Sequence, residues 1–123
     1  MVHQEERYPP SYPARKLLDI VGDRWTPVVL YVLRNSPKRY SQIQTAIPGI
    51  SKKMLTQVLR ALERSGLVHR TVHPVVPPRT EYRLTGTGRR LHEPVAALCD
   101  WATANEDLLD AIHERSRREA SSR

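Results

Sequence analysis

Two adjoining segments decide the fold of this chain. Ile50–Gly66 reads ISKKMLTQVLRALERSG, and Leu67–Arg83 follows it directly with LVHRTVHPVVPPRTEYR. The first segment has the apolar spacing of a helix with one buried face, and the second alternates around a proline-rich centre as a β-hairpin does. A helix with cationic residues at its start, followed at once by a basic hairpin, is typical of a winged helix-turn-helix.

The helix over 51–65 has clear signals at both ends. Ser51 suits the N-cap, because its hydroxyl can accept a hydrogen bond from a first-turn amide, and Gly66 suits the left-handed position after the last turn. The hairpin is expected to have strands at Leu67–His73 and Thr80–Leu84. The side chains that the helix is expected to bury are Met54, Leu55, Val58, Leu59 and Leu62.

Three helices are expected before this block. Residues 13–21 and residues 25–33 each carry apolar side chains at helical spacing, and the second of these segments is apolar enough to be a buried helix. Residues 39–47 predict a shorter helix that ends at a Pro48-Gly49 turn. This short helix and the helix over 51–65 are the two helices of the predicted helix-turn-helix.

One or two helices are expected after the hairpin. Thr85 can cap a helical region from about Gly88 to about Ile112, and Pro94 either kinks this region or marks where its regular part begins. The predicted fold class is therefore mainly α with a small two-stranded wing (α+β). It is a winged helix-turn-helix extended by one or two C-terminal helices.

The length of the chain sets its domain organisation. With 123 residues, the chain is long enough to build a single core. Residues 12–113 are expected to form one winged-helix domain that contains all the predicted helices and strands. Residues 1–11 are expected to be a flexible N-terminal arm, and residues 114–123 a flexible basic tail.

The charge balance favours a polyanionic partner. Twenty Lys and Arg against thirteen Asp and Glu give a formal net charge of +7, which suits nucleic acid or an anionic membrane. No apolar run approaches the roughly 18 residues that a spanning helix requires, and residues 1–11 lack the apolar region of a signal peptide. The single cysteine rules out an internal disulfide and fits a reducing cytoplasm, which is the expected location.

The polar face of the 51–65 helix has the chemistry of a DNA reader. Lys53, Gln57 and Arg60 follow each other at three- and four-residue steps, so they share one outward face. Lys and Arg suit guanine or the backbone, and Gln suits adenine. A solvated basic face is the alternative. However, Lys52 and Lys53 lie in the first turn, where the helix dipole disfavours cations, and phosphate binding would explain their presence there.

The hairpin adds further candidates near its tip. Arg79 is a candidate for a minor-groove or backbone contact, and the alternative is a surface ion pair with Glu81. The prolines at the tip limit its flexibility, so that binding costs less ordering entropy. The expected DNA-binding residues are Arg39, Ser41, Gln42, Ser51, Lys52, Lys53, Thr56, Gln57, Arg60, Arg70, His73 and Arg79.

Four segments in unbroken order resemble the HxlR-type transcriptional regulators, winged-helix proteins related to the MarR group. They are LLDIVGDRWTPVVLYVL at 17–33, the block from Lys38 to Arg70, VPPRTEYRLTGTGRRL at 76–91 and LCDW at 98–101. The resemblance implies a cytoplasmic homodimer that binds a partly palindromic operator. It also implies that the first helix and the C-terminal helices form the dimer contact, which assigns that role to Leu17, Leu18, Val95, Leu98, Trp101, Leu108 and Ile112.

One departure from the family bears on redox sensing. A branch of the family senses oxidants through a cysteine just before the first helix, in a Cys-Pro context, whereas Tyr12 precedes Pro13 here. Sensing by that route is therefore not expected. Cys99 lies on an apolar stripe and is expected to act as a small packing residue, with a slow or interfacial redox role as the alternative.

No enzymatic or metal site is expected. The five histidines are scattered, and His69 and His73 lack a third ligand. No paired carboxylates, nucleophile or phosphate-cradling glycine loop has a recognisable spacing, so neither a cofactor nor a catalytic residue is predicted. A small-molecule effector between the first, second and C-terminal helices, near Trp25 and Trp101, is a further hypothesis, and plain core packing of these rings is the alternative.

The leading prediction is a sequence-specific, dimeric DNA-binding regulator. The helix over 51–65 would lie in the major groove, and the wing over 67–84 would lie on the backbone or in the minor groove. Repression by occluding polymerase is expected, although activation is equally compatible with these residues. The alternative is a winged helix that serves as an architectural or protein-interaction module without reading a sequence.

Overall fold

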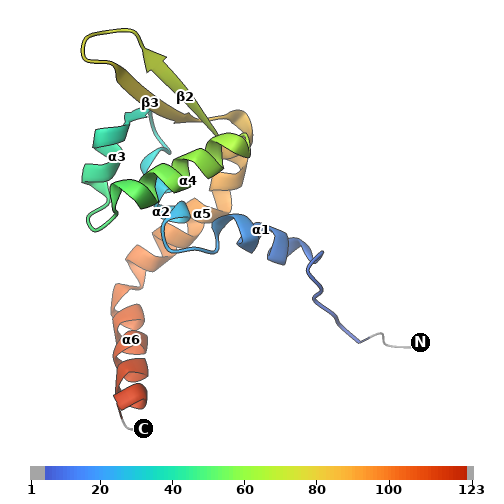
Figure 1. Ribbon diagram of the computed structural model, residues 1–123. Helices are drawn as coiled ribbons and strands as arrows, with labels where there is room; N and C mark the ends of the chain where they lie inside the picture. The colour runs from blue at the N-terminus through green and yellow to red at the C-terminus, as the bar shows by residue number, and fades with distance from the viewer. Residues whose placement is uncertain (1–4, 122–123) are drawn as a thin grey trace.

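The computed structural model describes residues 5–121. Figure 1 shows a compact head of helices and strands, from which α1 and α6 project. The elements, in chain order, are α1 (Pro13–Val21), α2 (Thr26–Val32), β1 (Lys38–Arg39), α3 (Tyr40–Ala46), α4 (Lys52–Arg64), β2 (Val68–His73), β3 (Arg79–Leu84), α5 (Gly86–Ala104) and α6 (Glu106–Ser121). The predicted class, mainly α with a small β wing, is confirmed.

The sheet has a third strand that the sequence analysis did not expect. Its order is β1-β3-β2, and both pairings are antiparallel. β1 places Lys38 opposite Tyr82 and Arg39 opposite Glu81. The prediction of a two-stranded sheet was therefore incomplete. A strand of two residues has no periodicity to recognise, and its pairing partner is distant in the sequence.

The core lies between α2, α3, α4, the start of α5 and one face of the sheet. The side chains with almost no exposed surface are Val29, Leu30, Ile43, Leu55, Leu59, Val68 and Val95. Burying each of these side chains stabilises the fold by about 1.5–3 kcal/mol before the entropy costs are subtracted. The predicted buried stripe of α4 is confirmed: Met54 is partly buried against the core, and its other four members are buried.

Both predicted end signals of α4 are confirmed. The Ser51 hydroxyl oxygen accepts a hydrogen bond of 3.0 Å from the Met54 amide. At the other end, the amide of Gly66 donates to the carbonyl of Glu63 and the amide of Leu67 donates to that of Leu62, which is the Schellman motif. Gly66 has φ of +75° there, a conformation that favours glycine.

The start of α2 is fixed by Asp23, which lies between the two segments that the sequence predicted to be helical. Asp23 Oδ2 accepts hydrogen bonds from the amides of Trp25 and Thr26 at 3.2 and 3.0 Å. Burial opposes ionisation of Asp23, but these amides and the Thr26 hydroxyl outweigh it, so the pKa of the carboxyl lies below its ordinary value. Pro27 occupies the first turn, where the missing amide hydrogen has no intrahelical acceptor to lose.

The C-terminal region departs from the prediction in two places. α5 runs through Pro94, and the break between α5 and α6 falls at Asn105 instead. α6 then continues to Ser121, past the predicted end at Ile112, so residues 114–121 of the expected flexible tail are helical. Residues 5–11 of the expected arm form no helix or strand, and residues 1–4, 122 and 123 lie outside the described range.

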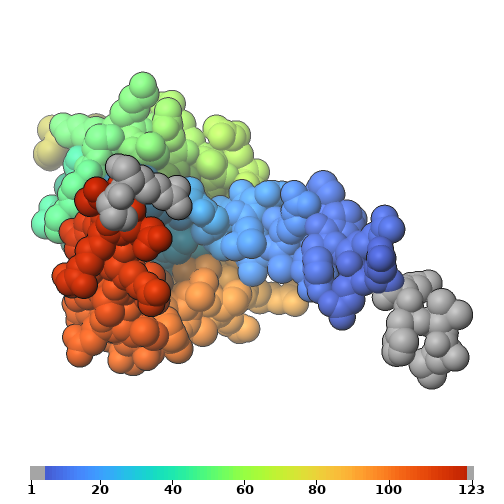
Figure 2. Space-filling model, turned by 90° about the horizontal axis from the view of Figure 1, so that it is seen from below, coloured from blue at the N-terminus to red at the C-terminus, as the bar shows by residue number. Residues whose placement is uncertain are grey.

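α5 begins against the end of α4. The Thr85 hydroxyl accepts from the Gly88 amide at 3.0 Å, as expected of an N-cap, and donates to the Gly66 carbonyl at 2.6 Å. A Cβ added to Gly88 would lie 2.0 Å from the carbonyl oxygen of Leu67, so glycine permits this close approach. Figure 2 shows α1 extending from one side of the molecule and α6 lying at the other side.

Candidate nucleic-acid interface

The outward face of α4 has the composition that the sequence analysis expected. Lys53, Gln57 and Arg60 are all exposed, and the opposite face of the helix lies in the core. Within residues 5–121, these three side chains make no hydrogen bond or ion pair with the protein. They are therefore available to an external ligand.

The first turn of α4 is strongly positive. Lys52 and Lys53 are exposed there, and the turn contains no acidic residue. The partial positive charge of a helix N-terminus adds to these two cations. An anion at this end would be stabilised by both the side chains and the free amides of the turn.

Tyr40 sets the angle between the two helices of the helix-turn-helix. Its hydroxyl donates to the Lys52 carbonyl at 2.9 Å and shares a hydrogen bond of 3.0 Å with the Thr56 hydroxyl. These contacts hold the start of α3 against α4. This role could not be predicted from the sequence, because no local signal links Tyr40 to Thr56.

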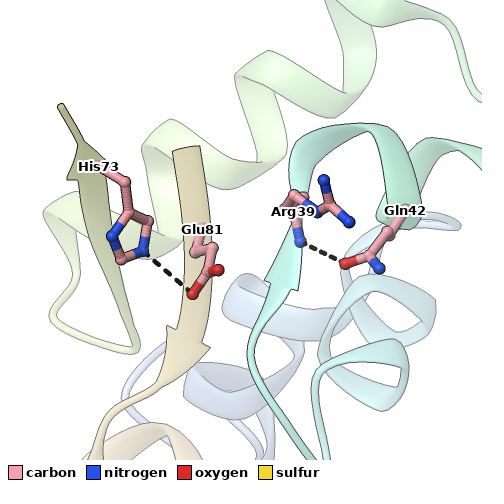
Figure 3. Close-up of polar contacts among 4 residues, drawn as sticks. All are labelled: Arg39, Gln42, His73 and Glu81. Carbon is pink, nitrogen blue, oxygen red and sulfur yellow. Dashed lines mark hydrogen bonds and ion pairs between the residues drawn. The ribbon is translucent and has the colours of Figure 1, made fainter. Parts of the chain in front are cut away.

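Three of the expected DNA-binding side chains make contacts within the protein that stabilise the fold. Ser51 caps α4, Thr56 is half-buried against Tyr40, and Oε1 of Gln42 accepts from the Arg39 amide at 2.8 Å (Figure 3). The Gln42 contact closes the first turn of α3. The side chains of these residues are therefore less free than those on the outward face of α4.

Two polar side chains of the wing lie beside glutamates. Arg70 Nε lies 3.4 Å from Glu63 Oε2 on α4, and His73 Nε2 lies 3.3 Å from Glu81 Oε2 on β3. Figure 3 shows the second pair on the sheet. The glutamate that the sequence analysis considered for Arg79 is thus beside His73. Arg79 is exposed and makes no hydrogen bond or ion pair within the described residues.

Three expected DNA-binding residues line one groove at the wing. Arg39 and Ser41 border it from β1 and α3, and Arg79 borders it from β3. The groove has a volume of about 410 Å³, and its other wall is the tip at 75–78, where the Val76–Pro77 peptide bond is cis. Two guanidinium groups at one groove suit a phosphate.

The residues assigned to a dimer contact fall into two groups. Val95 is only 1% exposed and packs in the core of its own chain, so it is not available to a second copy, and its assignment was wrong. Leu17 is partly buried. The other five are exposed on α1, α5 and α6, and they are Leu18, Leu98, Trp101, Leu108 and Ile112.

Cys99 is poorly suited to oxidant sensing. It is partly buried against the core, and burial together with the Asp100 carboxylate raises the pKa of its thiol. A higher pKa leaves less of the reactive thiolate. His92 nearby has its pKa lowered by burial and by Arg34.

Other candidate sites receive no support from the described surface. Residues 5–121 contain no group of three or more His, Cys, Asp or Glu arranged to hold a metal ion. Among the described helices, none is both long and apolar enough to span a bilayer. Four of the hollows on this surface have volumes of about 210–410 Å³, and neither Trp25 nor Trp101 lines them. An effector beside these rings therefore stays a prediction.

The structure has an exposed cationic helix, α4, with α3 packed against it and the wing adjacent. Together these elements define a winged helix-turn-helix protein of the DNA-binding type. Residues 20–110 match the family described as HxlR-like helix-turn-helix, and the chain belongs to that family. The resemblance inferred from the sequence is thereby confirmed.

Known relatives agree with this membership. The chain is 43% identical over 102 residues to the HTH-type transcriptional regulator YtfH of Escherichia coli, an alignment that spans 83% of this chain and 81% of YtfH. It is 37% identical over 107 residues to the HTH-type transcriptional regulator YdeP of Bacillus subtilis, covering 87% and 84% of the two chains.

A solved structure extends the likeness to three dimensions. The transcriptional regulator ytfH from Salmonella typhimurium superposes with a TM-score of 0.76 at 38% identity, covering 90% of this chain and 99% of that one. The chain is therefore a transcriptional regulator with a helix-turn-helix DNA-binding fold, and its relatives are regulators rather than enzymes.

Proposed function

We propose that the protein binds a specific operator in duplex DNA as a homodimer, with α4 of each protomer in a major groove. The observation that carries this proposal is the outward face of α4. Lys53, Gln57 and Arg60 lie there without a partner in the described chain, on a helix whose other face is fixed in the core. Their groups suit guanine, adenine and the backbone.

The wing supplies the second contact of each protomer. Arg39, Ser41 and Arg79 around the wing groove would bind the sugar-phosphate backbone beside the half-site, or the adjacent minor groove. Such contacts fix the register of the protein on the duplex and carry little sequence information. The reading of bases therefore falls to α4.

The second copy would cover the projecting helices. No residue of α6 is fully buried within the described chain, and Leu98, Trp101 and Ile112 are each more than half exposed. A helix with exposed apolar side chains and few contacts of its own is stabilised by packing on a partner. Two-fold symmetry would then place the half-site centres one helical turn, ~34 Å, or a multiple of it, apart.

Repression in the cytoplasm is the expected biological outcome. A dimer that covers an operator close to a promoter would occlude polymerase. The same DNA contacts would serve an activator if the operator lay upstream, so the position of the operator decides the sign of regulation.

Fluorescence anisotropy tests the proposal directly. The protein is titrated into duplex DNA from upstream of its own gene and its neighbour, and into the same DNA shuffled, at about 150 mM salt. We expect a preference of at least about a hundredfold for the native fragment, since specific sites usually exceed non-specific ones by more than that. Equal, strongly salt-dependent binding to both fragments would favour an architectural protein instead. Absence of binding to either fragment would contradict the proposal.

A further inference from the structure

The pairing register of the wing places its polar side chains on one face. Residues directly opposite each other in an antiparallel pair point to the same side of the sheet. On one side, Arg70 and Tyr82 point toward α4 and the core. The side chains on the other side define the outer sheet face, which consists of His69, Thr71, His73, Arg79, Glu81 and Arg83, together with Arg39 of β1.

This outer sheet face has a surplus of positive charge. Its three arginines are Arg39, Arg79 and Arg83, and its one carboxylate is Glu81. Glu81 lies 3.3 Å from His73 (Figure 3), and His73 therefore competes with the arginines for it. Arg83 is exposed and makes no hydrogen bond or ion pair within residues 5–121.

The cross-strand pairs neutralise only part of this charge. Arg39 stands opposite Glu81, and the same carboxylate also lies beside His73. His69 stands opposite Arg83, and His73 stands opposite Arg79. Neither arginine faces an acid, although opposite charges at facing positions would stabilise the sheet. The arrangement leaves the guanidinium groups of Arg79 and Arg83 to an external anion.

The outer sheet face is continuous with the wing groove. Arg39 and Arg79 belong to the face and also border the groove. Arg83 lies four positions further along β3, which corresponds to about 13 Å at about 3.3 Å per residue. One strand of duplex DNA carries a phosphate for about every 3.4 Å of its axis, so a row of this length faces several phosphates.

We propose that the outer sheet face binds the phosphate backbone of the DNA that flanks each half-site. The inference rests on the proposed function, since it needs α4 on the operator. Because the face is turned away from α4, the flanking duplex reaches Arg83 only by bending around the wing. Arg83 and His69 are thus additional binding residues, outside those that position or read the half-site itself.

A comparison of two duplexes tests this inference. Hydroxyl-radical footprinting of the upstream fragment locates the two half-sites. A core duplex that ends at their outer edges is then compared with an extended duplex that has one more helical turn of native DNA on each side. We expect the wild type to bind the extended duplex about tenfold or more tightly. The slope of log K against log salt should be steeper by about 0.9 for each added phosphate contact.

Two variants separate the contact with flanking DNA from the contacts with the half-sites. In Arg83→Gln/His69→Gln, we expect the advantage of the extended duplex to disappear and affinity for the core duplex to persist. Arg117→Gln removes one exposed arginine of α6, the helix that lies at the opposite end of the molecule from the wing in Figure 1, and should keep the full advantage. If the double variant is poorly folded by circular dichroism, Arg83→Gln alone serves for the comparison.

The outcomes distinguish this inference from the proposed function. Equal binding of both duplexes by the wild type would overturn the flanking contact while leaving operator binding intact. If the double variant still binds the extended duplex more tightly than the core duplex by the wild-type factor, the role of Arg83 and His69 would be overturned. Failure of the wild type to bind either duplex would overturn the proposed function and, with it, this inference.

Discussion

The hydroxyl of Tyr31 on α2 donates a hydrogen bond of 2.7 Å to Oδ1 of Asp100 on α5. The Arg34 guanidinium covers the Tyr31 ring, with its Cζ 3.8 Å from the ring centroid. The hydrogen bond between Tyr31 and Asp100 connects α2 to α5, the helix that carries the exposed Leu98 and Trp101. The hydrogen bond to Asp100, with a smaller contribution from burial, raises the pKa of Tyr31 above its ordinary value, although Arg34 opposes the shift.

Asp100→Asn is expected to lower the pKa of Tyr31 toward the ordinary value. The folded wild type keeps the Tyr31 proton at pH values where the unfolded chain has lost it, and the variant loses this difference. The stability from this raised pKa is present below about pH 10 and is lost as the pH rises through the folded pKa. NMR titration of ring-labelled tyrosine measures the shift, with Asp110→Asn on α6 as the matched control. An unchanged Tyr31 midpoint in Asp100→Asn would contradict the assignment.

Asp23→Ala is expected to destabilise the protein by about 1 kcal/mol at neutral pH, because the first amides of α2 lose their cap. The pKa of Asp23 is lowered in the folded state. The corresponding stability is therefore present above about pH 4 and is lost as the pH falls through the folded pKa. Urea unfolding across this range measures it. Asp19→Ala, an exposed change on α1, should shift stability by less than about 0.5 kcal/mol. Coincident unfolding curves for the wild type and Asp23→Ala would refute the capping role.

Local signals in the sequence were sufficient for the central block of the fold. The apolar stripe of α4, its Ser51 cap and its Gly66 stop depend on residues within a few positions of each other, and each was confirmed. The short strand β1 depends on pairing with Tyr82 and Glu81, far along the chain. No periodicity within two residues could have predicted it.

The candidate site was also predicted where local signals decide it and not where distant residues meet. The exposure of Lys53, Gln57 and Arg60 followed from helical periodicity. The wing residue that lies beside Glu81 could not be predicted in this way. The contact is with His73 rather than Arg79, and this depends on the strand register. Val95 was assigned to the dimer contact by family resemblance. That resemblance did not reveal that α5 buries Val95 in the core of its own chain and exposes Leu98 and Trp101 further along.

Gly66→Ala is expected to destabilise the protein by about 1–2 kcal/mol, because Cβ is disfavoured at positive φ. Gly86→Ala is the matched control. The added Cβ meets no atom within 4 Å there, and Gly86 lies in the first turn of α5, so a small gain or no change is expected. Thermal unfolding of both variants decides the matter. Equal effects would mean that the left-handed conformation of Gly66 carries no particular cost for alanine.

Gln57→Ala is expected to relax sequence preference, since a bidentate amide contact to adenine is worth about 1–3 kcal/mol of discrimination. Lys52→Ala should instead weaken binding to all sequences similarly and reduce the salt slope by about 0.9. Anisotropy titrations on the operator and on single-base variants separate the two effects. If Lys53, Gln57 and Arg60 were all changed to alanine and operator binding persisted unchanged, α4 would not present the reading face.

Leu98→Glu is expected to convert the proposed dimer into monomers. Leu98 is 61% exposed in the single chain, so the glutamate costs little there, whereas an apolar contact between two copies would bury its charge without a partner. Val72→Glu on the wing, at a side chain that is 53% exposed, should leave the dimer intact. Size-exclusion chromatography with light scattering measures both masses at several concentrations. A Leu98→Glu protein that still runs as a dimer would remove α5 from the contact. The surfaces to test next would then be α1 and α6, because they also carry exposed apolar side chains.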